Sequence, residues 1–265
     1  MIPTGTLIVM GVAGLFSVLL PFIFILVLRH KFKIQWVPVL IGAGIFILFA
    51  MVLEQVTHMF VLQPEADGSV PLIVDSPWLY VLYGVLAAGI FEETGRLFAF
   101  LLMKRKYKVV DSAVSYGVGH GGIEAIIIVG LGMLNSIIIG IMINSGGTIS
   151  GILPPGTAEA LTGTPVYMYV LSIIERVIAI TVHIALSILV WVAVMRKGKW
   201  WLFPLAIVLH ALTNVTAAMF QAGLLTNILV MYGGFTVMTM ITLWIAYKVG
   251  IKKSEAEAVF WESEE

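Results

Sequence analysis

The segment WLYVLYGVLAAGIFEETGRLFAFLLM, Trp78–Met103, decides the fold class of this chain. It is apolar over a length that crosses a bilayer, for which a helix needs about 20 residues. Its second half nevertheless holds Glu92, Glu93 and Arg96. Charged side chains at membrane depth are costly unless they pair with one another or bind an ion. The segment therefore predicts a membrane helix that carries a buried polar site.

The composition of the whole chain is that of a membrane protein. Of its 265 residues, 60% are hydrophobic and 11% are charged, whereas an average soluble domain is about 25% charged. The formal net charge is zero, so bulk charge suggests no nucleic-acid partner. The sequence has no cysteine, which excludes disulfides, thiolate metal ligands and a cysteine nucleophile. The first apolar run lacks a basic leader region and a cleavage site, so we expect a retained span.

Apolar runs of membrane-spanning length recur along the sequence and predict an all-α membrane protein. We expect a polytopic bundle of about seven transmembrane helices that forms a single transmembrane domain over residues 1–265. The predicted spans cover residues 5–28, 36–62, 78–103, 110–143, 166–195, 200–221 and 224–247. The connection 144–165 is rich in Gly, Pro and Thr, which predicts an irregular outer loop. Residues 254–265 predict a short acidic cytosolic tail.

The basic residues predict the orientation of the bundle. Thirteen of the fifteen Lys and Arg lie at alternate connections, in four clusters at residues 29–33, 104–108, 196–199 and 248–253, and the other two, Arg96 and Arg176, lie inside predicted spans. Two of the other connections, 63–77 and 144–165, contain neither residue type. Cytosolic connections carry an excess of Lys and Arg. We therefore expect the N-terminus outside and the C-terminus in the cytosol.

Four consecutive predicted helices bring polar groups to one depth in the membrane. Glu92 and Glu93, His120, His183 and His210 all lie roughly 15–18 Å from the cytosolic boundary, at a rise of about 1.5 Å per residue. The three histidines are three of only five in the chain. Such convergence favours a functional polar site over scattered packing contacts.

Each of these helices also has a second polar side chain one turn further along the same face. The pairs are Glu92 with Arg96, His120 with Glu124, His183 with Ser187, and His210 with Asn214. Two donor groups one turn apart on a helix suit a metal ion, and nitrogen and carboxylate ligands favour Zn²⁺. The glycines around His120 would let a neighbouring backbone approach closely, or would loosen the helix.

Some of these residues also have a purely structural interpretation. His120 and Glu124 would hydrogen-bond each other as a packing contact without a functional role. Glu54 and Arg176 both lie in the outer half of their predicted spans, and we expect them to form a structural ion pair with each other.

Four motifs in this order resemble a family of membrane enzymes. They are EETGR (Glu92–Arg96), HGGIEA (His120–Ala125), ERVIAITVHIALS (Glu175–Ser187) and HALTN (His210–Asn214). The first resembles the EExxR/K signature of the intramembrane metalloprotease superfamily, which includes the CAAX prenyl proteases with the Abi proteins, the PrsW proteases and the YhfC family. The set is most similar to YhfC-like proteins and covers about half of the chain. The gamma-secretase Aph subunit resembles the same superfamily yet is regarded as a scaffold.

The resemblance implies roles for the matching positions. It implies that Glu92 and Glu93 are catalytic carboxylates, that His183 and His210 are metal or water ligands, and that Glu124 is an essential carboxylate. The sequence departs from the pattern at Ser187, where PrsW-like proteins carry an aspartate, so one possible ligand is missing.

These observations lead to a hypothesis of an intramembrane zinc metalloprotease, a multi-pass protein of a prokaryotic cell membrane. Zn²⁺ would be held by His183, His210 and one or both of His120 and Glu124. Glu92 or Glu93 would take a proton from the metal-bound water, and Asn214 or Arg96 would stabilise the oxyanion. The substrate would be a transmembrane or lipid-proximal peptide, and water would enter through a cavity that opens near Lys104–Lys108.

Other classes of protein fit the same residues. In a proton-coupled transporter or permease, the carboxylates and histidines would relay protons, although the sequence shows no internal repeat of the kind that many transporters have. In a non-catalytic membrane scaffold, the histidines would only make interhelical hydrogen bonds. The histidine pairs would also suit a haem.

Overall fold

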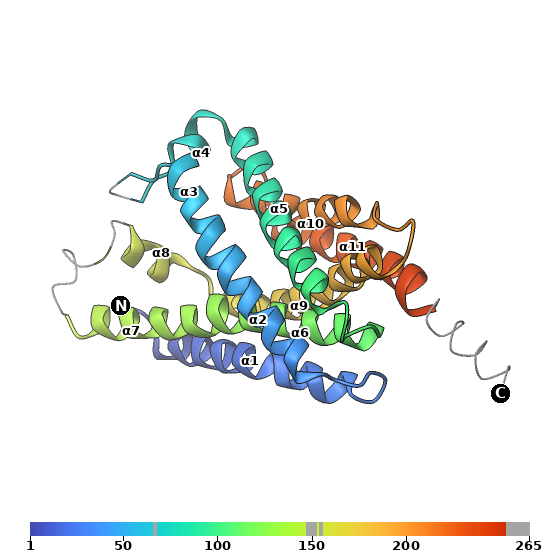
Figure 1. Cartoon of the computed structure of the whole chain (residues 1–265). Coiled ribbons are helices and arrows are strands. Elements are labelled where there is room, and N and C mark those ends of the chain that lie inside the picture. Colours follow the sequence, from blue (N-terminus) through green and yellow to red (C-terminus); the bar gives the residue numbers. More distant parts are fainter. Residues whose placement is uncertain (66–67, 147–152, 154–155, 253–265) are drawn as a thin grey trace, which may run out of the picture.

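The computed structural model describes residues 1–65, 68–146, 153 and 156–252 (Figure 1). Within these residues the chain is helical and contains no strand, which confirms the predicted all-α class. The predicted acidic tail, residues 254–265, lies outside the described residues. The α-helices are α1 Thr4–Leu28, α2 Trp36–Phe46, α3 Gln55–Val61, α4 Pro71–Asp75, α5 Pro77–Met103, α6 Val110–Glu124, α7 Gly132–Asn144, α8 Thr157–Gly163, α9 Val166–Met195, α10 Leu202–Gln221 and α11 Ile228–Ala246.

Three π-helical segments extend or join these helices. They are η1 Ile47–Glu54, η2 Ala125–Leu131 and η3 Tyr247–Ile251. As a result, α2, η1 and α3 form one continuous rod, and α6, η2 and α7 form another (Figure 1). The connection 144–165 was predicted to be irregular, but it contains the short helix α8. The sequence TAEALTG of α8 includes the strong helix formers Ala, Glu and Leu, which explains this difference.

Six rods in the described part of the chain are long and apolar enough to cross a membrane. They confirm a polytopic helical membrane protein, and they are Thr4–Leu28, Trp36–Val61, Val110–Asn144, Val166–Met195, Leu202–Gln221 and Ile228–Ile251. Helix α5 has 27 residues, but it carries Glu92, Glu93 and Arg96 and is not one of the six. The count of seven spans and the orientation therefore stay predictions.

Helix α9 forms the centre of the bundle. In the apolar stretch that makes α9 a candidate span, 78% of the residues are buried, against at most 33% in the same stretch of the other five candidate spans. The rod that contains α6 packs against α2 and α9, and α10 packs against α5, α9 and α11. Helix α5 also contacts α9. The four helices with the predicted polar residues are therefore neighbours around one interior region.

Candidate metal centre

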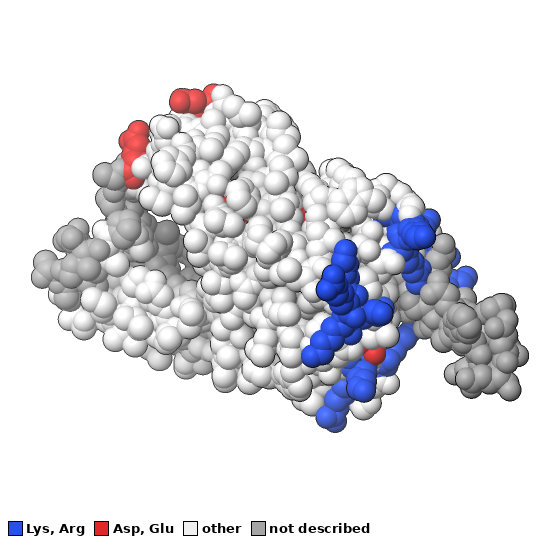
Figure 2. Space-filling view, viewed as in Figure 1, with Lys and Arg blue, Asp and Glu red and all other residues white. Residues whose placement is uncertain are grey.

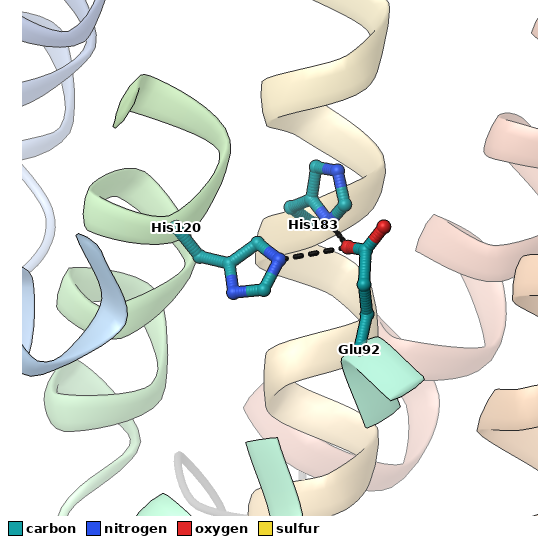
Figure 3. Close-up of side chains that lie close together, drawn as sticks. All are labelled: Glu92, His120 and His183. Atoms are coloured by element: carbon teal, nitrogen blue, oxygen red, sulfur yellow. Dashed lines mark hydrogen bonds and ion pairs between the residues drawn. The ribbon is translucent and has the colours of Figure 1, made fainter. Parts of the chain in front are cut away.

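Two histidines from different helices face the same carboxylate oxygen. Figure 3 shows His120 of α6 and His183 of α9 directed towards Glu92 of α5. Nε2 of His120 lies 2.8 Å from Oε2 of Glu92, and Nδ1 of His183 lies 3.8 Å from the same oxygen. One ligand atom of each residue lies within 4.8 Å of the other two, so the three side chains could hold one metal ion.

The chemistry of this group fits a metal ion. Two imidazoles and one carboxylate are a ligand set that catalytic zinc sites use, with a fourth position left for water. All three side chains are buried, with relative exposures of 8% for Glu92, 0% for His120 and 4% for His183. Nδ1 of His183 lies 3.1 Å from Nη2 of Arg96, and a guanidinium can only donate, so this nitrogen accepts and carries no proton. Its lone pair is therefore of the kind that binds a metal.

Glu93 follows Glu92 in α5 and is fully buried. Its Oε1 accepts hydrogen bonds from Nη1 of Arg96 and from Nδ1 of His210, the latter at 2.7 Å. Because Nδ1–H of His210 donates a hydrogen bond to Glu93, Nε2 is the unprotonated nitrogen of the neutral ring. This Nε2 lies 3.9 Å from Oε1 of Glu92. Glu93 and Arg96 therefore fix the orientation of His210 towards Glu92.

A second set of charges lies on the other side of His183. Oε2 of Glu124 is 2.6 Å from Nε2 of His183 but is not aligned for a hydrogen bond, and within the described residues it has no hydrogen-bond partner. Oε1 of Glu124 accepts a hydrogen bond of 2.6 Å from Arg176, which also pairs with Glu175. The hydroxyl of Tyr232 donates to Glu175 at 3.3 Å. Arg176 therefore holds Glu124 beside the imidazole.

The structure brings the predicted site residues to one place. The residues that could bind a metal ion there differ from those that the sequence predicted as ligands. Of the four residues predicted to bind metal, His120 and His183 belong to the group of possible ligands, together with Glu92, which was predicted to be catalytic. Glu124 contacts His183 from outside this group, and His210 lies next to Glu92. The catalytic and metal-binding roles of these residues stay predictions.

The predicted ion pair between Glu54 and Arg176 is wrong. Arg176 pairs with Glu124 and Glu175, whereas Glu54 lies 3.3 Å from Nε2 of His58 on its own rod. Residues at a similar depth can face different neighbours, and depth along the helices was the only basis for this prediction.

A cavity of about 130 Å³ adjoins the group. Glu92, His183 and His210 line it, and so does Asn214. Its other lining residues include Glu175 and Tyr232. The lining residues of α9 lie between His183 and the start of that helix, and those of α10 lie between His210 and its end. The cavity therefore extends from the histidines towards the connection between α8 and α9. A space of this size holds several water molecules, each of which occupies about 30 Å³ in the liquid.

The position of the cavity differs from the expected opening near Lys104–Lys108. A separate cavity of about 580 Å³ lies at that end, and its lining includes Lys108, Trp191 and Arg196. It shares no lining residue with the cavity beside the histidines. The site cavity instead extends away from the basic end of the molecule.

Fold and site together define a polytopic helical membrane protein with a candidate metal centre inside the bundle. A family model described as YhfC intramembrane metalloprotease matches residues 16–233. The chain is also 35% identical over 235 residues to the "Uncharacterized membrane protein YhfC" of Bacillus subtilis (strain 168), covering 86% of this chain and 90% of the relative. The chain therefore belongs to the YhfC intramembrane metalloprotease family. No solved structure matches it.

Proposed function

We propose that this protein is an intramembrane zinc metalloprotease that hydrolyses peptide bonds in transmembrane or lipid-proximal segments. The observation that carries the proposal is the buried convergence of Glu92, His120 and His183 from three helices. The description of the family supports hydrolysis of peptides. The Bacillus relative supports a prokaryotic cell membrane as the location.

Glu92, His120 and His183 would hold the zinc ion. The bound ion would supply Lewis-acid chemistry, because it acidifies a coordinated water and polarises a carbonyl. Arg96 donates to His183 without the ion, so its guanidinium would keep the ring oriented until the ion is bound. Glu124 would then accept a hydrogen bond from the Nε2–H of His183, as carboxylates beside metal-bound histidines do.

His210 is the residue best placed to move a proton. Its Nδ1 is held by Glu93, and its Nε2 faces Glu92 and the cavity. This arrangement resembles a carboxylate-oriented imidazole base, in which the buried carboxylate fixes the tautomer. His210 would take a proton from the attacking water and return it to the leaving amine. Glu93, which does not line the cavity, would be a positioning residue.

Asn214 would bind the carbonyl oxygen of the substrate. It lies one turn after His210 in α10 and lines the same cavity. A side-chain amide directed at the developing negative charge is a common oxyanion stabiliser. The amide would therefore act next to the proton-carrying imidazole.

The test separates metal ligands from the proton carrier by measuring zinc content and cleavage of a membrane peptide library. We expect His120→Ala and His183→Ala to lose both zinc and cleavage. We expect His210→Ala to keep most of its zinc but lose cleavage. His58→Ala is the matched control, since this histidine lies outside the group, and it should keep its zinc. Zinc content unchanged in both His120→Ala and His183→Ala would overturn the proposal.

Two other functions give different results in the same preparations. A proton-coupled permease would move its substrate into liposomes without bound metal. A scaffold would hold no metal and would co-purify with a partner protein. Either result would replace the protease proposal.

A further inference from the structure

A second and larger cavity adjoins the site cavity. Its volume is about 560 Å³, and it lies among α3, α5 and α10. Asn214 and Ala217 line both cavities, so one turn of α10 forms a shared wall between them. The volume is within the range of about 300–1,000 Å³ that small-ligand sites occupy.

The lining of the larger cavity combines apolar and uncharged polar side chains and carries no Lys, Arg, Asp or Glu among the described residues. It offers two tyrosine hydroxyls, two amides and one imidazole, from Tyr80, Tyr83, Asn214, Gln221 and His58. Such groups can donate and accept hydrogen bonds without a net charge. This chemistry suits the N–H and C=O groups of a peptide backbone better than it suits a charged ligand.

One wall of the cavity is held in place by a buried carboxylate. Nδ1 of His58 lies 2.8 Å from the hydroxyl of Tyr83, and its Nε2 lies 3.3 Å from Glu54. Glu54 is 6% exposed, so the imidazole is fixed between α3 and α5. The cavity therefore has a preformed polar wall at His58 and Tyr83.

The substrate of an intramembrane protease needs such a surface. A helix that enters the site must unwind to expose a peptide bond, and its freed backbone groups are costly in lipid unless the protein binds them. The larger cavity lies at the end of α3, the start of α5 and the end of α10. This end of the molecule is opposite to the basic clusters.

We propose that the larger cavity binds an extended, uncharged peptide segment of the substrate and admits it to the metal centre past Asn214 and Ala217. The inference rests on the proposed protease function, because it assigns the binding of the same substrate. It places substrate entry at the end of the molecule away from the Lys and Arg clusters.

Access is tested by blocking the larger cavity. A Cβ atom at Gly84 would meet no atom within 4 Å, and this residue lines the cavity, so Gly84→Phe would place a ring in it. Gly44→Phe is the matched control, because a Cβ at Gly44 also meets no atom within 4 Å and the residue is exposed on α2. The natural chain has no cysteine, so Ala217→Cys adds a single thiol at the shared wall.

A membrane-impermeant maleimide should modify the thiol at position 217 from the side away from the basic clusters. We expect Gly84→Phe to slow this reaction by about ten-fold or more, because an aromatic ring fills much of the passage. Gly44→Phe should leave the rate unchanged. Equal rates in the two variants, or modification only from the basic side, would overturn the assigned entry.

Peptide binding is tested with a photo-crosslinker. The probe is a transmembrane peptide of about 20 residues with a Gly-Pro break beside a benzophenone, and its control lacks the break. We expect the broken peptide to crosslink to the wild type and to Gly44→Phe but not to Gly84→Phe. Equal crosslinking of Gly84→Phe and Gly44→Phe would overturn the proposal in favour of a surface contact. Loss of crosslinking in phosphatidylglycerol vesicles but not in phosphatidylcholine vesicles would overturn it in favour of a lipid site. Neither readout needs zinc or cleavage, so this proposal and the protease function can fail separately.

Discussion

At the scale of single residues, each charge inside the bundle has a partner of opposite charge or an imidazole. Arg96 pairs with Glu93, and Arg176 pairs with Glu124 and Glu175. A buried charge that loses its partner is strongly destabilising, whereas a well-paired one is tolerated. The membrane interior thus accepts these ionisable residues because they neutralise one another around the histidines. The same pairs fix the rotamers of the candidate ligands.

Glu124 gives a prediction about metal affinity. Its Oε2 lies 2.6 Å from Nε2 of His183 and would orient that ring when zinc is bound. We expect Glu124→Gln to weaken zinc binding about 10–100-fold, the usual loss when a partner of a ligand histidine is removed. Competition with a fluorescent zinc chelator measures the affinity. Glu175→Gln is the control, because Glu175 also contacts Arg176 but makes no contact of this kind with His183. An equal loss in both variants would assign the effect to Arg176 instead.

The sequence predicted which residues converge but not which of them contact one another. The depth of a residue in the membrane follows from counting residues along its helix. The common layer of Glu92, His120, His183 and His210 could therefore be predicted. The rotation of each helix about its axis is set by packing, which one sequence does not reveal. For this reason the contacts of Glu92 with His120 and of Glu93 with His210 could not be assigned to the adjacent carboxylates in advance.

At the scale of helices, the glycines of α6 allow it to lie unusually close to two neighbours. A Cβ at Gly119 would lie 1.9 Å from the carbonyl oxygen of Val39 in α2, and one at Gly117 would lie 2.5 Å from Cα of Ile184 in α9. Small residues at such contacts are typical of packed membrane helices. Of the two roles considered for these glycines, close approach is the one that the structure shows. His120 reaches Glu92 from the helix held in this way.

The glycine contact predicts that an added methyl group will disturb the metal centre. Gly119→Ala would push α6 from α2, because the clash is with backbone that cannot rotate away. We expect a loss of about 1–3 kcal/mol or more in the free energy of unfolding, as for other overpacked interiors, together with reduced zinc content. Unfolding in detergent and elemental analysis measure the two effects.

Gly132→Ala is the matched control on the same rod, since a Cβ there meets no atom within 4 Å. It should be neutral or stabilising by about 0.5–1 kcal/mol, the usual difference between Ala and Gly in a helix. Equal stability and zinc content in the two alanine variants would show that the close approach of α6 is not needed.

The helices themselves were largely predictable from apolar runs. The predicted span 166–195 coincides with α9, and the predicted span 5–28 begins one residue after the start of α1. The π-helical segments were not predicted, because hydrophobic patterns report length and burial but not a change of hydrogen-bond register. Segment η2 begins directly after the half-buried Glu124, and η1 ends at the buried Glu54, so both changes of register adjoin a carboxylate inside the bundle.

At the scale of the whole molecule, charge is strongly segregated. Figure 2 shows Lys and Arg gathered at one end of the visible face, next to a surface that is almost free of charge. Helix α5 fits this arrangement although it carries Glu92, Glu93 and Arg96. Its exposed large side chains are apolar, among them Leu82, Leu86 and Phe98, while Glu92, Glu93 and Arg96 are buried. Lipid around α5 would therefore meet an apolar surface.

The number of crossings can be decided at this scale by the position of α5. If α5 spans the membrane with the six apolar rods, the two termini lie on opposite sides, and the connections before and after α5 also lie on opposite sides. The basic residues 104–108 then belong in the cytosol. We expect alkaline phosphatase to be active when fused after Ser69 and inactive when fused after Lys106, and a fluorescent protein at the C-terminus to fold in the cytosol. Phosphatase activity in both fusions would mean that α5 does not cross the membrane. The charged residues Glu92, Glu93 and Arg96 would then need partners other than those that they have in this bundle.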